Sequence, residues 1–185
     1  MTITFTDLIT KMGDKTDKLT RHHLDKLYGP LLTPKIPTAR NVLEIGLGNG
    51  GSLVALGLFF YNAKVYGVEN LTYLYPPEHL PNVVFQHGDA YSTEWLDAAF
   101  SHIPKWDVIL DDGSHEMKDQ LFTLEYFKDK LAPNGIILIE DVKRGYVDHI
   151  FDNFTGDPKY LTLLDRTRAG HSEFDDDYVI MYYID

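Results

Sequence analysis

The chain has 185 residues with 28 acidic and 17 basic side chains, a formal net charge of −11 and no cysteine. This length suits one domain (1–185) with a sizeable core, the acidic balance argues against a general affinity for nucleic acid or anionic membranes, and the missing cysteine excludes disulfides, thiolate catalysis and cysteine-based zinc sites. No apolar run approaches 18 residues and the first residues lack a signal-peptide core, so we expect a cytoplasmic location and no membrane partner.

Two helices are expected near the start of the chain, over 3–12 and 19–29, followed by a proline-bearing connector over 33–39. From there, apolar strands and helical stretches alternate. The predicted strands cover 41–46, 64–69, 82–89, 106–112, 135–141, 159–165 and 178–184, and helices are predicted over 51–60 and 115–131. This alternation, with strands that are apolar throughout, predicts an α/β domain in which a parallel sheet carries helices on both faces.

A glycine-rich turn, EIGLGNGGS (44–52), joins the first predicted strand of the sheet to the helix after it. Gly46, Gly48 and Gly51 satisfy G-x-G-x-x-G, which permits a tight turn and close approach by a ligand. Glu69 ends the next strand, where it can accept hydrogen bonds from ribose hydroxyls. The pattern predicts a nucleoside-like ligand; the alternative is a plain strand-to-helix turn beside a solvated acid.

The glycine pattern does not separate NAD from S-adenosylmethionine, but two acids favour the second. Glu44 stands two residues before the first glycine, which is awkward beside a pyrophosphate and suits a cationic ligand that carries an amino group. Asp89, in the HGDA turn after the third strand, offers a further acceptor near an adenosine. We therefore expect S-adenosylmethionine.

The stretches VLEIGLGNGGSL, VYGVE and QHGDA resemble the class I S-adenosylmethionine-dependent methyltransferases, over most of the chain from residue 41. The resemblance implies a Rossmann-like, doubly wound, mostly parallel seven-stranded sheet over 39–185, with the last strand antiparallel. It also implies that the turn at Gly46 and Gly48 holds the methionine part, that Glu69 holds the ribose, and that Asp89 lies by the adenine.

A second motif, VILDDGSH (108–115), places Asp111, Asp112 and His115 at the end of a buried strand. Two carboxylates ~4 Å apart repel by about 4 kcal/mol at an effective dielectric of 20, so a cation, a proton or exposure to water should compensate. The structural alternative is that Asp111 or Asp112 caps a helix that starts near His115, with Ser114 an equally suitable cap.

This motif, together with IEDV (139–142) and TDKLTRHHLDKLY (16–28), is similar to the metal-dependent sugar O-methyltransferases that act on glycosylated macrolides. The resemblance implies that Asp112, Glu140 and Asp141 bind Mg²⁺ or Mn²⁺ and that His115 is the general base. Hard carboxylate oxygens suit these ions, and an imidazole with a pKa near 6.5 can take a proton at neutral pH. Acids at strand ends often contact the cofactor in the wider superfamily, which implies such a contact for Asp111.

The same resemblance implies that residues 1–38 form a helical lid over the cofactor. Lys18 or His22 would then touch the methionine carboxylate or the acceptor. The alternative is a solvated amphipathic helix.

Together these patterns predict a divalent-metal-assisted O-methyltransferase that acts on a hydroxyl of a sugar or a sugar-containing small molecule. A homodimer is left open. Three alternatives are methylation of a catechol-like or other small-molecule hydroxyl, an NAD-binding oxidoreductase, and a non-catalytic domain that binds the cofactor within an assembly.

Overall fold

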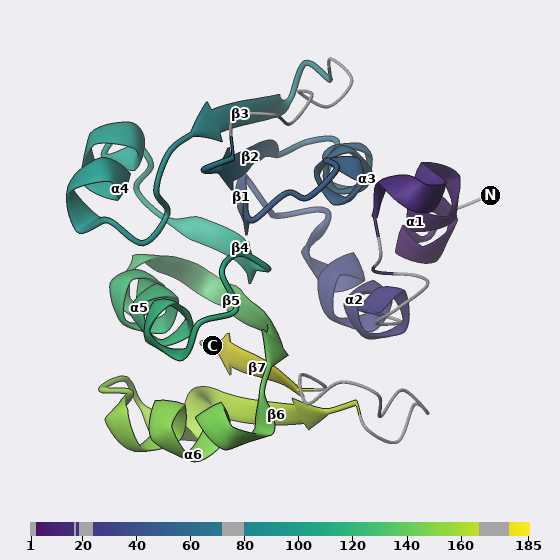
Figure 1. Cartoon of the computed structure of the whole chain (residues 1–185). Helices are drawn as coiled ribbons and strands as arrows, with labels where there is room; N and C mark the ends of the chain where they lie inside the picture. The colour runs from purple at the N-terminus through teal and green to yellow at the C-terminus, as the bar shows by residue number, and fades with distance from the viewer. Residues whose placement is uncertain (1–2, 17, 19–23, 72–79, 167–177) are drawn as a thin grey trace.

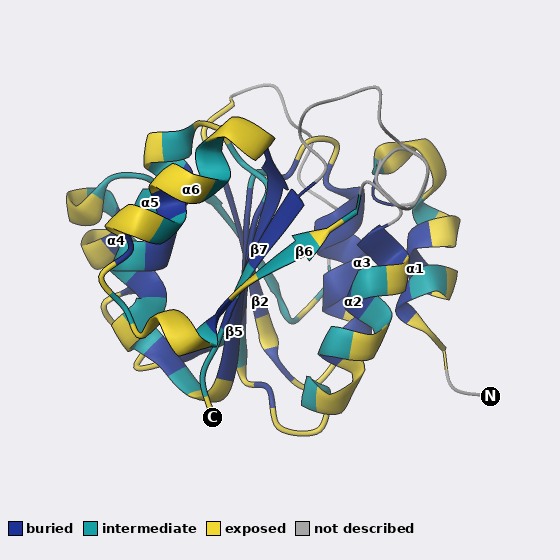
Figure 2. Cartoon of the chain, turned by 90° about the horizontal axis from the view of Figure 1, so that it is seen from below, coloured by how far each residue is buried: buried dark blue, intermediate teal, exposed yellow. Residues whose placement is uncertain are grey.

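The computed structural model describes residues 3–16, 18, 24–71, 80–166 and 178–185. A seven-stranded sheet lies between two layers of helices, with α1–α3 on one face and α4–α6 on the other (Figures 1 and 2). The strand order is β3-β2-β1-β4-β5-β7-β6, and β7 runs antiparallel to both of its neighbours while the other pairs are parallel. The predicted fold class is therefore confirmed.

The elements follow one another in the alternating order that the sequence predicts. The helices are α1 (Phe5–Met12), α2 (Leu24–Leu32), α3 (Gly51–Phe59), α4 (Thr93–Phe100), α5 (Met117–Phe127) and α6 (Arg144–Asn153). The strands are β1 (Asn41–Ile45), β2 (Lys64–Glu69), β3 (Val83–His87), β4 (Trp106–Asp111), β5 (Leu131–Val142), β6 (Leu161–Asp165) and β7 (Tyr178–Tyr183).

Two helices in the structure have no counterpart among the predicted elements. In α4 the side chain of Ser92 accepts a hydrogen bond from the backbone of Trp95 (3.3 Å), but only Leu96 and Phe100 are buried. In α6 Ile150 is buried, and Tyr146, Val147 and Phe151 pack against the same core. The apolar residues of both helices recur at helical spacing, but the helices are only 8 and 10 residues long, so each repeat covers too short a stretch to be recognised readily.

Each predicted helix differs from its expected bounds, and two of them differ by more than two residues at one end. The helix expected over 115–131 is shorter, because α5 begins at Met117 and a 3-10 turn, Lys128–Lys130, follows it. The helix expected over 19–29 continues to Leu32, past Pro30, while its residues 19–23 lie outside the described part of the chain. A proline in the last turn removes one donor without ending the helix.

Strand residues alternate between two apolar cores, one under each helix layer. Val108 and Leu110 pack on the side of α1–α3, and Ile109 packs on the opposite side. This explains why the strands are apolar throughout, since both faces of the sheet are covered (Figure 2). None of the helices in the described ranges has the length and apolar character that crossing a bilayer requires.

The N-terminal helices contribute to the first of these cores. The Phe5 ring on α1 lies 5.2 Å from that of Phe59 on α3 and 5.8 Å from that of Tyr28 on α2. Because α1 covers it, α3 is buried on nearly every side, with only Leu58 exposed. The described helices of the predicted lid thus share a core with the sheet, and the division into a lid (1–38) and a core (39–185) stays a prediction.

Candidate functional site

Two cavities lie beyond the carboxyl ends of the parallel strands, where ligands bind in open α/β sheets. One, of about 600 Å³, is lined by residues that follow β1, β2, β3 and β4, and the other, of about 490 Å³, lies between the glycine turn and residues 13–18. Gly46, Gly48 and Asp112 line both. The cavities therefore meet at the glycine turn, and each is of a size that suits part of a nucleotide-like ligand.

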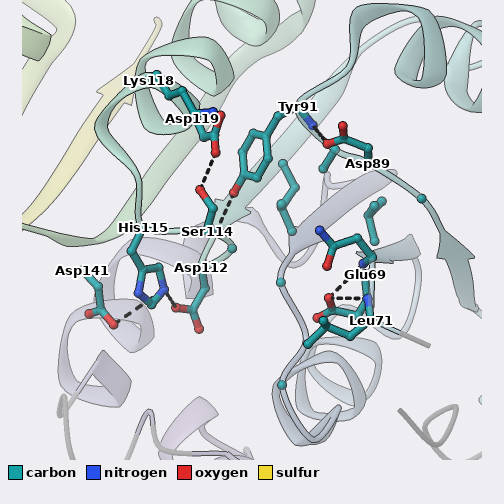
Figure 3. Close-up of a pocket in the computed structure, with 18 residues that line it drawn as sticks. Glu69, Leu71, Asp89, Tyr91, Asp112, Ser114, His115, Lys118, Asp119 and Asp141 are labelled. Carbon is teal, nitrogen blue, oxygen red and sulfur yellow. Dashed lines mark hydrogen bonds and ion pairs between the residues drawn. The ribbon is translucent and has the colours of Figure 1, made fainter. Parts of the chain in front are cut away.

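The larger cavity contains the two acids predicted to hold a nucleoside (Figure 3). Glu69 is buried at the end of β2, and its carboxylate accepts backbone hydrogen bonds from Leu47 (3.0 Å), Asn70 (2.8 Å) and Leu71 (3.1 Å). Asp89 accepts one from Tyr91 (2.9 Å). Both side chains are fixed by their own loops and line the same cavity, which is the geometry that ribose and adenine contacts need.

The smaller cavity contains Glu44, which is fully buried on β1. Among the described residues neither of its carboxylate oxygens accepts a hydrogen bond of good geometry, although the nearby Ser52 hydroxyl lowers the pKa of Glu44. The Lys18 ammonium lies 3.9 Å from Oε1. Burial raises the pKa of Glu44 to about 7, against the opposing effect of Lys18. A buried carboxylate without hydrogen bonds is costly, so this cavity is suited to a ligand that brings a cationic amino group.

The glycine turn allows the two halves of the site to approach each other. Gly46 has φ +78°, and a Cβ there would lie 2.1 Å from the carbonyl oxygen of Asp112. Gly48 has φ +48°, with open space around a Cβ. Gly46 is thus required by the chain's own packing against the DDGSH turn, whereas Gly48 leaves room beside the cavities.

Asp111 is buried behind the DDGSH turn and lines neither cavity. Its carboxylate accepts hydrogen bonds from the hydroxyls of Tyr91 (2.8 Å) and Thr123 (2.5 Å) and from the Gly113 backbone (3.2 Å). Burial raises its pKa to about 6 in spite of these donors. Asp111 therefore accepts its hydrogen bonds from other residues of the chain, and its contact with the cofactor stays a prediction.

The expectation that Asp111 or Asp112 caps the following helix is wrong. The residue before α5 is Glu116, and no side chain caps the helix there. Ser114 instead accepts a hydrogen bond from the Glu116 backbone (3.2 Å) and donates one to Asp119 (2.7 Å). Asp111 and Asp112 do not reach the first turn of α5, because the turn from Ser114 to Glu116 separates them from it.

Tyr91 fixes the shape of the DDGSH turn, a role that sequence reasoning missed. Its hydroxyl donates to Asp111 and accepts from the Ser114 backbone (3.0 Å).

Tyr91→Phe should lower the free energy of unfolding by about 1–2 kcal/mol, because a buried carboxylate loses one donor. Urea unfolding measures this, with Tyr61→Phe, an exposed tyrosine on the surface, as the control that should change it by less than about 0.5 kcal/mol. Equal effects in both variants would contradict the role of Tyr91.

His115, Asp112 and Asp141 converge at the edge of the larger cavity (Figure 3). The His115 Nε2 lies 3.1 Å from Asp112 Oδ1 and 4.0 Å from Asp141 Oδ2, and one ligand atom from each residue falls within 4.8 Å of the others. His115 and Asp141 both have left-handed φ angles, +56° and +51°. Such backbone conformations cost roughly 1–3 kcal/mol each in non-glycine residues and cluster at functional sites.

The hydrogen bond to Asp112 raises the pKa of His115 to about 9, against the opposing effect of burial. A general base must be neutral to accept a proton. His115 can therefore act as the base only when the charge of Asp112 is engaged by another partner.

Glu140, at the tip of β5, is buried on the inner side of this group. The Lys18 ammonium contacts both of its carboxylate oxygens (2.8 and 2.7 Å) and Asp112 Oδ2 (2.8 Å). The Tyr28 hydroxyl also donates to Glu140. Burial alone would lower the pKa of Lys18, but Asp112, Glu140 and Glu44 together raise it well above its usual value. Lys18 is therefore a charged residue of the acid cluster. Its contact with the methionine carboxylate or the acceptor stays a prediction, and His22, the alternative residue for that contact, lies outside the described part of the chain.

The donor set at these strand tips suits a divalent cation in its chemistry. Asp112, Glu140 and Asp141 offer carboxylate oxygens, and burial raises the pKa of Glu140 to about 8, with Asp112 adding to the effect. In the described residues, the Lys18 ammonium faces Glu44, Asp112 and Glu140, and Arg166 pairs with Asp141 Oδ1 (3.1 Å). The His115 ring adds a third partner of positive charge when it is protonated, 3.1 Å from Asp112. A divalent ion at these carboxylates would take over part of the charge balance that Lys18 and His115 now provide.

Comparison with known proteins adds a family and a set of similar folds. A family model described as a methyltransferase domain matches residues 43–142. Mycinamicin VI 2''-O-methyltransferase from Micromonospora griseorubida is 29% identical over 112 residues, which are 57% of this chain and 28% of that protein. The 8-demethyl-8-alpha-L-rhamnosyl tetracenomycin-C 2'-O-methyltransferase from Streptomyces olivaceus is 29% identical over 141 residues, 71% of this chain and 36% of that protein.

Among solved structures, MycE methyltransferase from the mycinamycin biosynthetic pathway, in complex with Mg and SAH, superposes with a TM-score of 0.78 at 18% identity. The match covers 100% of this chain and 55% of that one. The O-methyltransferase from Bacillus cereus in complex with SAH superposes with a TM-score of 0.59 at 17% identity, over 98% of this chain and 90% of that one. The two solved structures share the fold of this chain. The part of the chain that matches the two curated relatives spans about a third of their length.

Proposed function

This chain belongs to the methyltransferase-domain family, and from that premise we propose that it is an S-adenosylmethionine-dependent O-methyltransferase. The single observation that carries the proposal is the buried carboxylate of Glu44, which accepts no hydrogen bond of good geometry from the described residues and faces the cavity under the glycine turn. An amino-acid ammonium satisfies it, and a pyrophosphate does not. NAD is therefore disfavoured as the ligand.

The two joined cavities divide the donor between them. Glu44 would receive the ammonium of the methionine part in the smaller cavity, and Glu69 and Asp89 would receive the ribose and adenine in the larger one. Gly46 and Gly48 lie where the cavities meet, which leaves the sulfonium methyl beside Asp112 and His115. In methyl transfer the acceptor oxygen forms a bond to this methyl carbon while the bond from carbon to sulfur breaks, and the acceptor hydroxyl gives up its proton.

Asp112, Glu140 and Asp141 would hold the divalent ion, Mg²⁺ or Mn²⁺, which supplies positive charge that lowers the pKa of an acceptor hydroxyl. His115 would take the proton at Nε2, the atom that faces Asp112 and Asp141. The remaining task of the chain is positioning, because methyl transfer needs alignment of the three reacting centres.

We propose a sugar hydroxyl as the acceptor. The wall of the larger cavity that contains His115 also includes the polar side chains of Ser114, Lys118 and Asp119 (Figure 3). The hydroxyl, ammonium and carboxylate of these side chains can form hydrogen bonds with the hydroxyls next to the one that is methylated in a sugar. A catechol would instead need flat apolar walls. The sugar O-methyltransferases among the relatives support the same choice.

Glu44→Gln tests the proposal at its central observation. It should weaken binding of S-adenosylhomocysteine about 10–100-fold, since a hydrogen bond to a charged group contributes roughly 1.5–3 kcal/mol. The Tm should change little, because a neutral side chain costs less to bury while the 3.9 Å pair with Lys18 is lost. Calorimetric titration and thermal unfolding measure the two quantities.

The matched control is Glu94→Gln, which removes the same charge from an exposed site on α4 and should leave affinity within two-fold. A parallel titration with NADH should give no binding heat. Unchanged S-adenosylhomocysteine affinity in Glu44→Gln, or binding of NADH in its place, would refute this assignment. The cytoplasmic location and the homodimer stay predictions.

A further inference from the structure

We propose that Lys18 is an internal cation that competes with the divalent ion for Glu140, so that binding of the metal requires Lys18 to leave the acid cluster. The proposal rests on the metal-binding part of the proposed function and concerns its regulation. It follows from which carboxylate oxygens are engaged and from which side.

The inner half of the cluster is already closed by an ammonium. Lys18 Nζ lies 2.8 and 2.7 Å from the two oxygens of Glu140 and 2.8 Å from Asp112 Oδ2, and its side chain is 1% exposed. The Tyr28 hydroxyl takes a further position on Glu140. An ion that bound Glu140 would have to occupy the space next to these same oxygens, where it would meet the positive charge of Lys18 at short range.

The outer half of the cluster faces the larger cavity. Asp112 Oδ1, the His115 ring and the Asp141 carboxylate are grouped there, while the other oxygen of Asp112, Oδ2, contacts Lys18. An ion that enters from the cavity meets these groups first. It gains Glu140 only by displacing Lys18, and Asp112 contributes one oxygen to each half.

Lys18 also connects the cluster to the roof of the smaller cavity. Residues Gly13 to Thr16 and Lys18 line that cavity, and the Lys15 backbone lies so close to the glycine turn that a Cβ on Gly51 would be 2.6 Å from its carbonyl oxygen. Among the described residues of this segment, Lys18 is the one whose side chain contacts Asp112 and Glu140 at the tips of β4 and β5. Release of Lys18 would therefore loosen the roof over the proposed methionine site, and metal binding and cofactor binding would be linked.

The direct test is the chemical reactivity of the Lys18 amine in the wild-type protein. EDTA-treated protein is labelled with an amine-reactive reagent, with and without saturating MgCl₂, and modification at each lysine is followed by mass spectrometry. Without metal, Lys18 should react at least about ten-fold more slowly than exposed Lys15, since a buried, ion-paired ammonium is inaccessible. With Mg²⁺ the Lys18 rate should rise at least ten-fold, while the Lys15 rate stays within two-fold.

Two variants give an independent readout. Lys18→Met removes the competing charge and keeps an apolar stem of similar length, and Lys11→Met removes an exposed charge from α1, outside both cavities. Calorimetric titration with Mn²⁺ should show at least ten-fold tighter binding in Lys18→Met and unchanged binding in Lys11→Met. Equal or weaker Mn²⁺ binding in Lys18→Met would overturn the competition.

Other results would also overturn the proposal. These are a Lys18 amine that stays protected while calorimetry shows Mg²⁺ bound, and a wild-type protein that binds neither ion. Neither measurement uses a methyl acceptor, so an inactive protein that shows the exchange refutes only the proposed activity. An active protein with Lys18 protected in its metal-bound form refutes only the exchange.

Discussion

Substitution of His115 by alanine should lower the rate constant of methyl transfer about 10²–10⁴-fold, the usual cost of removing a general base. Among the described residues, His115 is the imidazole that lies among the acids at the tips of β4 and β5, with Nε2 facing Asp112 and Asp141. Formation of S-adenosylhomocysteine under saturating donor and acceptor measures the rate. Affinity for S-adenosylhomocysteine should stay within several-fold, because His115 lies at the edge of the larger cavity.

The matched control is His102→Ala, which removes an exposed imidazole from the loop before β4, at the opposite end of the sheet. It should leave both quantities unchanged. A near-normal rate in His115→Ala at neutral pH would remove this residue from the role of base and would leave the acceptor hydroxyl to lose its proton by another route.

Substitution of Gly46 by alanine should lower the free energy of unfolding by about 3 kcal/mol or more. The added Cβ would meet the Asp112 carbonyl oxygen at 2.1 Å, and φ +78° is itself unfavourable for alanine. The DDGSH turn would have to move away from the glycine turn, so the variant should also lose activity. Urea unfolding and the methyl-transfer rate report these two effects.

Gly48→Ala is the matched control, because Gly48 also has a positive φ, of +48°, but has open space around a Cβ. Its cost should be limited to the conformational strain, about 1 kcal/mol. Equal destabilisation in the two variants would mean that strain, rather than contact with Asp112, makes a glycine necessary at position 46.

The sequence predicted the sheet well because its strands are buried on both faces. β2 has the predicted bounds, 64–69, and β1 and β4 end within one residue of expectation. The position of β7 between β5 and β6 carries no local signal, since pairing is decided by packing between distant segments. The helices α4 and α6 were missed although their apolar residues pack on the sheet at helical spacing, because each helix is only 8 or 10 residues long and its repeat is correspondingly brief.

The sequence predicted which residues make up the candidate site better than it predicted the hydrogen bonds and ion pairs between them. Motif spacing brings Asp112, His115 and Glu140 to adjacent strand tips, and the structure places them together. Motif spacing could not predict that Lys18 lies between Asp112 and Glu140, because both residues are more than ninety positions away from it in the chain. It also could not predict that Tyr91 and Thr123 would engage Asp111, because such contacts depend on how two loops and a helix pack.

The antiparallel β7 also has a consequence for synthesis on the ribosome. Its residues 178–183 pair with β5 on one side and β6 on the other, and these two strands are not neighbours in the sheet. While the chain is still emerging, β6 has no strand beside it, and its backbone donors and acceptors remain exposed. Completion of that half of the sheet must therefore wait until translation has passed residue 183, which leaves a temporary edge open to self-association in the nascent protein.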